Sequence, residues 1–438
     1  MRTSFTPDQL ADPGIADANA ILRACVHCGF CNATCPTYML LGDELDGPRG
    51  RIYLIKEMLE QDRAPVADEV LHIDRCLSCL ACMTTCPSGV NYMHLVDHAR
   101  HHIESNFRRP WAERLARAAI GRVLPDPALF RPLLALARLF APLARLLPGA
   151  AGRMARMTPE PSAASPIPEA RAAADGVTTF PAEGARLHRV ALLAGCVQRT
   201  LAPAINAATI RLLTRHGCEV LLVSEPACCG AMTTHLGQGA SGRASAAAMV
   251  RALFALIETG GLDAIISNAS GCGTMIKDYG HLFQTDPDRA GPAERISGLA
   301  RDISEFVADI GLRAPVIKPG LAVAYQSACS LRHGQKVTTQ PISLLRQCGF
   351  IVTEPAESHI CCGSAGTYNI LQGAIADRLC ARKADSLAAL KPEVVASGNI
   401  GCMIQLGAAV TFPVFHTVEL LDWATGGPCP PALEEMNT

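Results

Sequence analysis

Residues 25–36, CVHCGFCNATCP, and residues 76–87, CLSCLACMTTCP, share one pattern of four cysteines followed by a proline. In this C-x2-C-x2-C-x3-C-P pattern, a tight loop with a thiol at every third residue can hold three corners of an iron–sulfur cube. The fourth cysteine points away from that cube and binds the other one. Two copies of the pattern therefore predict two 4Fe–4S clusters whose ligands cross between the loops.

The crossing assigns four cysteines to each cluster. The first cluster is predicted to bind Cys25, Cys28, Cys31 and Cys86. The second cluster is predicted to bind Cys76, Cys79, Cys82 and Cys35. A structural zinc site would instead take two well-separated cysteine pairs around a closed tetrahedron, which a triplet with a distant partner does not resemble.

Composition restricts the class of protein. The chain has 438 residues, 49% of them apolar and 18% charged, so it is long enough for several globular domains. Its formal net charge of -1 gives no reason to expect a nucleic-acid partner. The N-terminus lacks the apolar region of an export signal, and no long apolar run predicts a membrane span. We therefore expect a cytoplasmic chain whose cysteines hold metal or do redox chemistry rather than form disulfides.

The second half of the chain repeats itself. Three cysteines recur at an offset of 133 residues and a fourth at an offset of 130, each set including a CCG turn. The first set is Cys196, Cys228, Cys229 and Cys272, and the second is Cys329, Cys361, Cys362 and Cys402. Two tandem domains of one design are the simplest explanation. The predicted segments are a cluster domain over 1–107, an Arg/Leu-rich amphipathic segment and linker over 108–185, and CCG domains over 186–312 and 313–438.

Within each repeat, short apolar strands alternate with amphipathic helices. In the first repeat, strands are predicted at 189–195, 218–225 and 262–268, with helices at 203–217 and 242–261 between them. This alternation predicts a mainly parallel sheet, in which sites gather beyond the carboxyl ends of the strands. The repeat cysteines fall at these strand ends.

A family resemblance follows from these motifs. Residues 42–56, GDELDGPRGRIYLIK, are similar to the α-helical ferredoxin domain of succinate dehydrogenase-like and glycolate oxidase-like iron–sulfur proteins. The half with two CCG turns resembles the cysteine-rich domain pair of heterodisulfide reductase and of anaerobic glycerol-3-phosphate dehydrogenase subunits. In this order and length, the chain most resembles the iron–sulfur subunits of glycolate oxidase. The implied fold is α+β multidomain, with an N-terminal α-helical ferredoxin-like domain followed by two tandem α/β CCG repeats.

The resemblance implies an electron-transfer subunit. Such a subunit accompanies flavin-binding subunits that oxidise glycolate to glyoxylate, and it passes electrons toward a respiratory acceptor. The chain has no G-x-G-x-x-G after a strand and no G-x-x-x-x-G-K-S/T loop, so substrate oxidation is expected on another subunit, and no catalytic residue is assigned. Two alternatives are a subunit of a glycerol-3-phosphate or D-lactate dehydrogenase, and a heterodisulfide reductase-type subunit that cleaves a disulfide at its CCG site.

The contents of the CCG sites are open at this point. Ala269 and Asn399 occupy the first position of the C-x-x-C that ends the fullest CCG pattern, so each repeat keeps four thiols of five. Four thiolates suffice for one further iron–sulfur cluster or one zinc ion, and metal-free redox thiols are the third interpretation. The missing thiol weighs against the noncubane clusters and the disulfide chemistry that a resemblance to heterodisulfide reductase implies.

An arginine-rich stretch follows the first domain. Residues 101–157 hold ten arginines, no lysine and three acidic residues, and Arg131, Arg138 and Arg145 recur every seven residues beside a leucine face. Such a helix can lie peripherally on the inner face of the cytoplasmic membrane or dock a partner subunit. Alternatively, it packs on its own protein and is interrupted by Pro142.

Other conspicuous residues have simpler interpretations. Cys218, Cys348 and Cys380 have no partner at ligand spacing and are predicted to be buried structural thiols. Arg49 and Arg51 either raise the reduction potential of a cluster by their charge or are solvated residues at the start of a helix.

Overall fold

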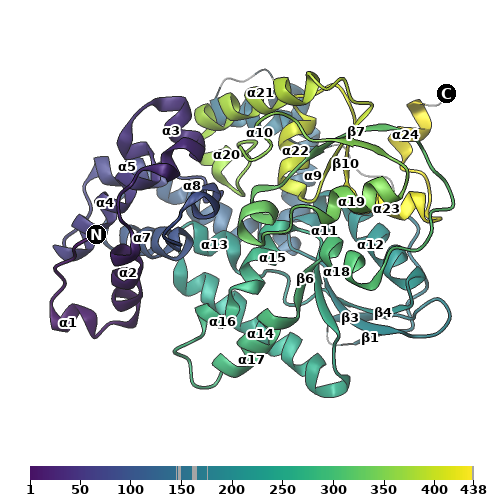
Figure 1. Ribbon diagram of the computed structural model, residues 1–438, viewed down its shortest axis with the longest axis horizontal. Coiled ribbons are helices and arrows are strands. Elements are labelled where there is room, and N and C mark those ends of the chain that lie inside the picture. Colours follow the sequence, from purple (N-terminus) through teal and green to yellow (C-terminus); the bar gives the residue numbers. More distant parts are fainter. Residues whose placement is uncertain (145, 147–148, 160–164, 175, 437–438) are drawn as a thin grey trace.

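The N-terminal domain consists of short helices, at the left of Figure 1. The computed structural model describes residues 1–144, 146, 149–159, 165–174 and 176–436. The helices of this domain are α1 (Pro7–Leu10), α2 (Pro13–Ala24), α3 (Pro36–Leu41), α4 (Pro48–Glu60), α5 (Ala67–Asp74), α6 (Ala81–Thr85) and α7 (Tyr92–Asn106), with the 3-10 turns η1 (Phe30–Thr34) and η2 (Glu44–Asp46). α1 to α4 each begin with proline, which suits the first helical position because that residue needs no backbone donor.

The core of this domain lies between α2, α4, α5 and α7. Leu22, Ile55, Ile73 and Leu95 are fully buried in one cluster, one from each of these helices. α4 lies between the two cysteine loops in the sequence. The two loops therefore project from a helical frame with its own hydrophobic centre.

Three arginine-rich helices follow: α8 (Trp111–Val123), α9 (Pro127–Ala144) and α10 (Gly149–Arg156). The expectation that Pro142 interrupts the helix is wrong, because α9 contains both Pro132 and Pro142 and continues to Ala144. Pro142 lies in the last turn of α9, where it removes one backbone hydrogen bond, the one to the carbonyl four residues earlier. The predicted arginine stripe includes Arg145, which lies outside the described residues.

The first CCG repeat is built on a six-stranded sheet in the order β1-β2-β4-β3-β5-β6. Its strands are β1 (Ala172–Ala174), β2 (Val177–Phe180), β3 (His188–Leu193), β4 (Cys218–Val223), β5 (Ala264–Ser267) and β6 (Ala300–Asp302). β4, β3, β5 and β6 are parallel, as predicted, whereas β1 and β2 form an antiparallel extension. This extension lies in the segment predicted as linker, so the sheet begins upstream of residue 186. The prediction of a linker rested on the small residues and prolines of this segment. Pairing with the edge of β4 outweighs the low strand propensity of these residues.

Helices cover the first sheet on both faces. They are α11 (Gln198–Leu201), α12 (Pro203–Arg215), α13 (Ala231–His235), α14 (Gly239–Gly260), α15 (Ser270–Lys277), α16 (Tyr279–Leu282), α17 (Ala290–Leu299) and α18 (Ile303–Ile310). α14 is the one helix of the described residues that is long and apolar enough to cross a bilayer. Its Val250, Leu253 and Ile257 pack instead into the core of the repeat, against Ile265 of β5, so we interpret it as a core helix.

The second repeat has a four-stranded, fully parallel sheet in the order β10-β9-β7-β8. Its strands are β7 (Ala322–Gln326), β8 (Ile351–Thr353), β9 (Val394–Ser397) and β10 (Val414–His416). Its helices are the π-helical η3 (Ser330–Gly334), α19 (Gln340–Gln347), α20 (Tyr368–Leu371), α21 (Gly373–Ala388), α22 (Ile400–Gly407), α23 (Thr417–Ala424) and α24 (Pro431–Met436). Read from the other edge, β8-β7-β9-β10 repeats the order β4-β3-β5-β6 of the first sheet. The internal repeat is therefore confirmed in three dimensions.

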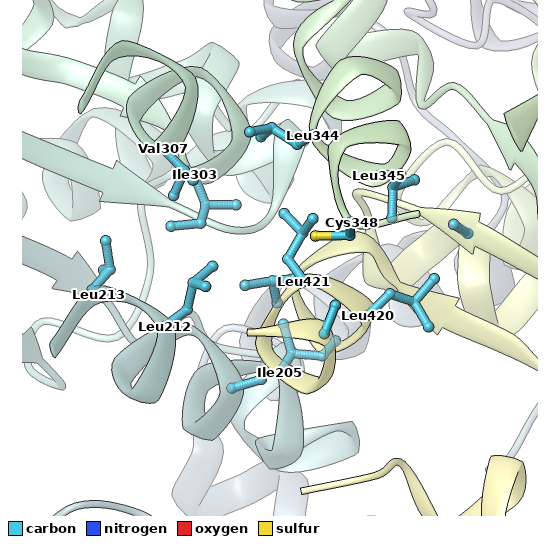
Figure 2. Packing of buried hydrophobic residues seen from close by; sticks show 14 of the residues in the cluster. Ile205, Leu212, Leu213, Ile303, Val307, Leu344, Leu345, Cys348, Leu420 and Leu421 are labelled. Atoms are coloured by element: carbon cyan, nitrogen blue, oxygen red, sulfur yellow. The ribbon is translucent and has the colours of Figure 1, made fainter. Parts of the chain in front are cut away.

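The two repeats pack against each other through equivalent helices. Figure 2 shows the shared hydrophobic cluster, to which α12 and α18 contribute from the first repeat and α19 and α23 from the second. Leu212 of α12, Val307 of α18, Leu345 of α19 and Leu420 of α23 are fully buried there. Because one apolar cluster is continuous across both sheets, the repeats form one rigid support for their cysteine turns.

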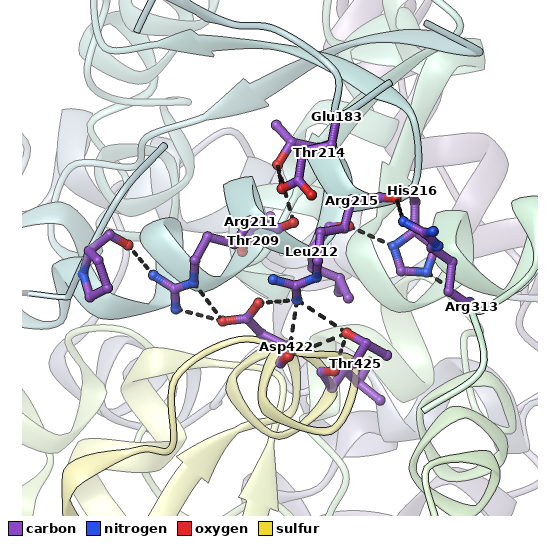
Figure 3. A network of polar contacts seen from close by, with 12 residues as sticks. Glu183, Thr209, Arg211, Leu212, Thr214, Arg215, His216, Arg313, Asp422 and Thr425 are labelled. Carbon is purple, nitrogen blue, oxygen red and sulfur yellow. Dashed lines mark hydrogen bonds and ion pairs between the residues drawn. The ribbon is translucent and has the colours of Figure 1, made fainter. Parts of the chain in front are cut away.

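A buried polar network closes one end of this interface (Figure 3). Arg211 of α12 donates to the carboxylate of Asp422 on α23 over 2.8 Å from Nε and 2.5 Å from Nη2, and Arg215 also pairs with this carboxylate. Asp422 is 1% exposed. An acidic group so deeply buried is tolerated because two guanidinium groups satisfy it, and the pairing specifies how α12 meets α23.

Candidate metal centres

The two cysteine loops have the same backbone conformation. His27 and Gly29 in the first loop have φ angles of 58° and 84°, and Ser78 and Leu80 in the second have 50° and 63°. Three of these residues are not glycine, and a left-handed conformation is costly for them unless the surrounding structure requires it. The same turns at matching positions show that both loops curl around a centre in the same way.

The first predicted ligand set converges on one cavity. Its lining includes Cys25, Cys28, Cys31 and Cys86, so a thiol of the second loop does reach the first triplet. Burial, together with the neighbouring charges of Cys25, Cys86 and Cys28, raises the pKa of the Cys31 thiol to about 11. Cys82, which is assigned to the second set, also lines this cavity and marks the contact between the two sites.

The second predicted set is also brought together. Burial raises the pKa of Cys82, and the nearby charges of Cys76 and Cys35 add to this shift. Burial likewise raises the pKa of Cys79, which has Cys82 and Cys35 among its charged neighbours. Cys35 of the first loop therefore lies with the triplet of the second loop, which is the arrangement that crossed ligation requires.

The donor set of each loop pair fits an iron–sulfur cluster. Thiolates that crowd one another in a buried site are unstable without positive charge, as the raised pKa values of Cys31 and Cys82 express. A metal cluster supplies that charge and allows the thiols to deprotonate. The residues present are thus those that the bound cluster needs, and the helical frame holds them in place.

A buried arginine contacts one of these ligands. Arg51 is 1% exposed and directs Nη1 to Cys35 Sγ over 3.8 Å, while its Nε donates to the His72 carbonyl over 2.7 Å. Arg51 Nη2 also lies 3.7 Å from the buried carboxylate of Asp46, whereas Arg49 pairs with Glu44 at 2.6 Å near the surface. Of the two interpretations of the GPRGR segment, a charge close to a cluster site applies to Arg51, because its guanidinium is buried beside the sulfur of a predicted ligand, Cys35.

We expect Arg51→Gln to lower the reduction potential of the cluster held by the second loop by roughly tens of millivolts, because it removes a buried positive charge beside Cys35. Potentiometric titration followed by electron paramagnetic resonance measures this shift. Arg51→Lys, which keeps the charge, is expected to shift the potential less. Arg49→Gln, on the same helix but exposed, should leave the second-loop potential unchanged, and equal shifts in all three variants would contradict the role of the buried charge.

The first CCG site lies beyond the carboxyl ends of three adjacent strands. Cys196 follows β3, the Cys228–Cys229 turn follows β4, and Cys272 lies in α15 after β5. Hydrogen bonds from Cys196 and Cys229 lower the pKa of Cys228 to about 3, and the Gly230 amide also donates to its sulfur over 3.3 Å. The pKa of Cys229 is raised by its contacts with Cys228 and Cys272. The four thiols are thus a connected group.

The second CCG site repeats this arrangement at the ends of β7, β8 and β9. Hydrogen bonds from Cys361 and Cys402 lower the pKa of Cys362, and contact with Cys329 raises that of Cys361. The Gly363 amide donates to Cys361 Sγ over 3.4 Å. Four thiols from three neighbouring strands therefore meet in each repeat, which suits a compact metal centre better than separate structural cysteines.

Three residues lie beside the second CCG site that sequence reasoning did not place there. Asn399, which replaces a cysteine of the C-x-x-C, donates its amide to Cys402 Sγ over 3.5 Å. Lys383 is 2% exposed, and although burial lowers its pKa, nearby thiolates favour its charged form. Cys380 was correctly predicted to be buried, but it lies in one cluster with Cys362 and Cys402. The spacing of cysteines in the sequence does not point to a lysine and a cysteine on α21, because only the folded structure brings this helix next to the site.

The two CCG sites differ in their distance from the cluster loops. Leu77 and Cys79 of the second loop pack in one cluster with Cys329 and Cys361 of the second CCG site. Tyr368 beside this site donates to the carbonyl of Arg75, and Thr84 lies 2.8 Å from His333 Nδ1. The first CCG site has no such shared cluster among the described residues. The N-terminal domain therefore presents its second loop to the second repeat.

Two other cysteines have the predicted structural role. Cys218 of β4 and Cys348 at the end of α19 are fully buried in the cluster between the repeats. Burial raises the pKa of each to about 12, so both remain protonated. All twenty cysteines are free in the structure.

Family models match both parts of the chain. A 4Fe-4S dicluster domain matches residues 21–90, and a cysteine-rich domain of CCG type matches residues 190–277 and 323–407. A solved structure of a hypothetical protein from Helicobacter pylori covers 97% of this chain and 74% of its own, with a TM-score of 0.54 at 10% identity. At that identity the likeness concerns the fold alone.

Similar proteins extend over the full length. The glycolate oxidase iron-sulfur subunit of Escherichia coli is 40% identical over 97% of this chain and 99% of its own. A probable glycolate oxidase iron-sulfur subunit of Bacillus subtilis is 31% identical over 92% of this chain and 94% of its own. Lactate utilization protein A of an Exiguobacterium strain is 26% identical over 54% of this chain and 98% of its own. With an N-terminal dicluster domain and two CCG domains in one chain, this protein belongs to the family of glycolate oxidase iron–sulfur subunits.

Proposed function

We propose that this chain is the electron-transfer subunit of a flavin-dependent complex that oxidises glycolate to glyoxylate and reduces a respiratory acceptor. The observation that carries the proposal is the series of adjacent thiol sites, from the first loop through the second loop to the second CCG site. Bound iron–sulfur clusters accept and donate single electrons without requiring a substrate to bind. The chain supplies the thiols proposed as ligands and a buried guanidinium at Arg51.

The residues present indicate which cofactors this chain binds and which belong to partner subunits. The cysteine sites hold ligands for clusters, whereas the sequence has no dinucleotide-binding or phosphate-binding loop. We therefore assign the flavin and the glycolate site to partner subunits, in accord with the name of the relative from Escherichia coli. The ligands of the two N-terminal clusters are proposed to be the crossed sets that converge in space.

Exposed apolar residues on α8 and α9 support a contact surface. Trp111, Leu115, Leu139 and Leu143 are between 62% and 77% exposed, so these four side chains do not pack on their own protein. Arginines accompany this face, and Arg131 is exposed. We propose that α8 and α9 attach the subunit peripherally to the rest of the complex or to the inner face of the cytoplasmic membrane.

The purified single chain is expected to show no dye-linked oxidation of glycolate, because it provides neither a flavin site nor an assigned catalytic base. The measurement is glycolate-dependent dye reduction by anaerobically purified chain with both N-terminal clusters loaded. Co-expression with flavin-binding partner subunits should restore it. Reduction by the single chain would contradict the proposal.

The same reconstituted complex also tests the nearest alternative, in which the complex oxidises D-lactate instead of glycolate. Lactate utilization protein A matches about half of this chain, so D-lactate is a reasonable second substrate to test. We expect a higher kcat/KM with glycolate than with D-lactate. The opposite preference would assign the subunit to a lactate-oxidising complex while leaving its electron-transfer role intact.

A further inference from the structure

A cavity of about 240 Å³ lies between the N-terminal domain and the first CCG repeat, away from all the cysteine sites. Helices α2 and α7 line it on one side, and α13, α15 and α16 line it on the other. Among the described residues, its lining includes no lysine or arginine but several histidines and aspartates. These are Asp17, His94, Asp97, His98, His235, Asp278 and His281. The electron-transfer role proposed above uses none of these groups.

Six of these side chains form three histidine–aspartate pairs, and every pair joins the two domains. In each pair one partner lies on α2 or α7 and the other on α13, on α16 or at the end of α15. The pairs are His94 with Asp278 at 2.8 Å, Asp97 with His235 at 3.1 Å, and Asp17 with His281 at 3.5 Å. Such a pair is an ion pair only while the imidazole is protonated, and the charge of histidine changes near neutral pH. The contact between the two domains can therefore respond to pH.

His94 is the ring in this cavity whose surroundings favour the charged form. Burial opposes a charge on the ring, but the hydrogen bond to Asp278 and the carboxylates of Asp278, Asp17 and Asp97 outweigh burial and raise the pKa of His94. The ring of His281 is stacked on that of His94, with centroids 3.5 Å apart and an interplanar angle of 4°. Burial and the nearby charge of His94 lower the pKa of His281. Of the two stacked rings, His94 is therefore the one that becomes charged first as the pH falls.

Both ring nitrogens of His94 have hydrogen-bond partners in the neutral and in the charged form. Nε2 lies 2.8 Å from Asp278 Oδ1 and can donate to it in both forms. Nδ1 lies 3.0 Å from the side-chain amide of Asn91, which can offer its NH2 group to the neutral ring or, turned over, its oxygen to the charged ring. Gain or loss of the second proton therefore changes the charge of the pair with Asp278 and keeps its hydrogen bond.

Helix α7 connects this cavity to the second cysteine loop. Arg100 of α7 donates to the carbonyl of Cys76 over 2.7 Å and to the hydroxyl of Ser78 over 2.6 Å. The same guanidinium lies 3.8 Å from Asp97, the partner of His235. The helix that holds the second loop thus also carries one member of two of the three pairs.

We propose that the three histidine–aspartate pairs form a pH-sensitive latch between the N-terminal domain and the first CCG repeat, with His94 as its titrating group. Because folding raises the pKa of His94 above its unfolded value, the contribution of His94 to stability is complete below about pH 6.5 and is lost as the pH rises through the folded value. His281, whose pKa is lowered, stays largely neutral in the folded chain above pH 6.5. In alkaline solution the latch therefore holds α7 less tightly against the first repeat.

Thermal unfolding of the anaerobically purified full chain, with its clusters bound, tests the latch. Tm is measured at pH 6.5 and at pH 9 for the wild type and for His94→Gln, which can form hydrogen bonds but cannot become charged. We expect His94→Gln to lower Tm by roughly 1–3 °C at pH 6.5 and by less than half as much at pH 9. His98→Gln is the matched control, because His98 lines the same cavity and belongs to none of the pairs. It should change Tm equally at both pH values.

The partner carboxylate provides the second variant. Asp278→Asn should lose the same pH-dependent part of the stability, and adding His94→Gln to it should have no further pH-dependent effect. If His94→Gln does not fold, Asp278→Asn measured at both pH values decides the question. A Tm difference from the wild type that is equal at the two pH values, or larger at pH 9, would overturn the latch.

Hydrogen exchange at pH 6.5 locates the effect in the fold. Relative to the wild type, His94→Gln should exchange faster in α7, α15 and α16, while exchange in α21 of the second repeat should be unchanged. Faster exchange spread evenly over the chain would mean a general loss of stability and would contradict a latch at this interface. None of these measurements involves glycolate oxidation, so a negative result would leave the proposed function intact.

Discussion

Replacing Cys35 by serine is expected to damage the cluster held by the second loop, and replacing Cys86 the cluster held by the first. The reason is that Cys35 lies among the thiols of Cys79 and Cys82, whereas Cys86 lies beside Cys31. Each variant should lose up to about four iron atoms, the content of one cube. Iron analysis together with electron paramagnetic resonance of each reduced variant identifies which signal has changed.

Two controls make this result decisive. Cys218→Ser alters a thiol that is buried far from the loops, and it should keep both signals and all iron. Cys35→Ala excludes ligation by the serine oxygen and should cause the same loss as Cys35→Ser. If each substitution damaged only the cluster of its own loop, the crossed assignment would be wrong, and each loop would hold its cluster with four local thiols.

Substitutions in the CCG turns are expected to have the second-largest effect. We expect both Cys228→Ala and Cys361→Ala to lower metal content and electron transfer to the acceptor while the two N-terminal cubes remain bound. The structure adds a difference between the two sites, because Cys361 shares a packed cluster with Leu77 and Cys79 of the second loop. Cys361→Ala should therefore also alter the resonance signal of the second-loop cluster, and Cys228→Ala should not.

Iron, zinc and sulfide counts on the two variants also identify what the sites hold. A loss of iron and sulfide favours a third and fourth cluster, a loss of zinc favours a structural ion, and unchanged metal with impaired electron transfer favours redox thiols. Cys348→Ala, a buried thiol outside both sites, is the matched control. Unchanged metal and normal electron transfer in both variants would mean that the CCG repeats are a scaffold or docking surface.

Much of the architecture could be predicted because its signals lie along the chain. The spacing within residues 25–36 and 76–87 depends on how a short loop wraps around a cube, which involves only neighbouring residues. The repeat was visible as a constant offset, and its strands and helices as apolar periodicities. The exceptions were β1 and β2, which lie in the segment predicted as linker: β2 pairs with the free edge of β4, and β1 pairs with β2.

The two cysteine loops, the tandem CCG repeats and the position of their thiols at strand ends follow from residue order alone, because each depends on local spacing and on the rules of parallel sheets. Domain packing, in contrast, sets which CCG site meets the second loop, buries Arg51 beside Cys35, and brings Asp17, His94 and His281 together. These facts depend on how the surfaces of separate domains fit together. Residues that are far apart in the chain carry no spacing signal for such contacts, so domain packing alone brings them within reach.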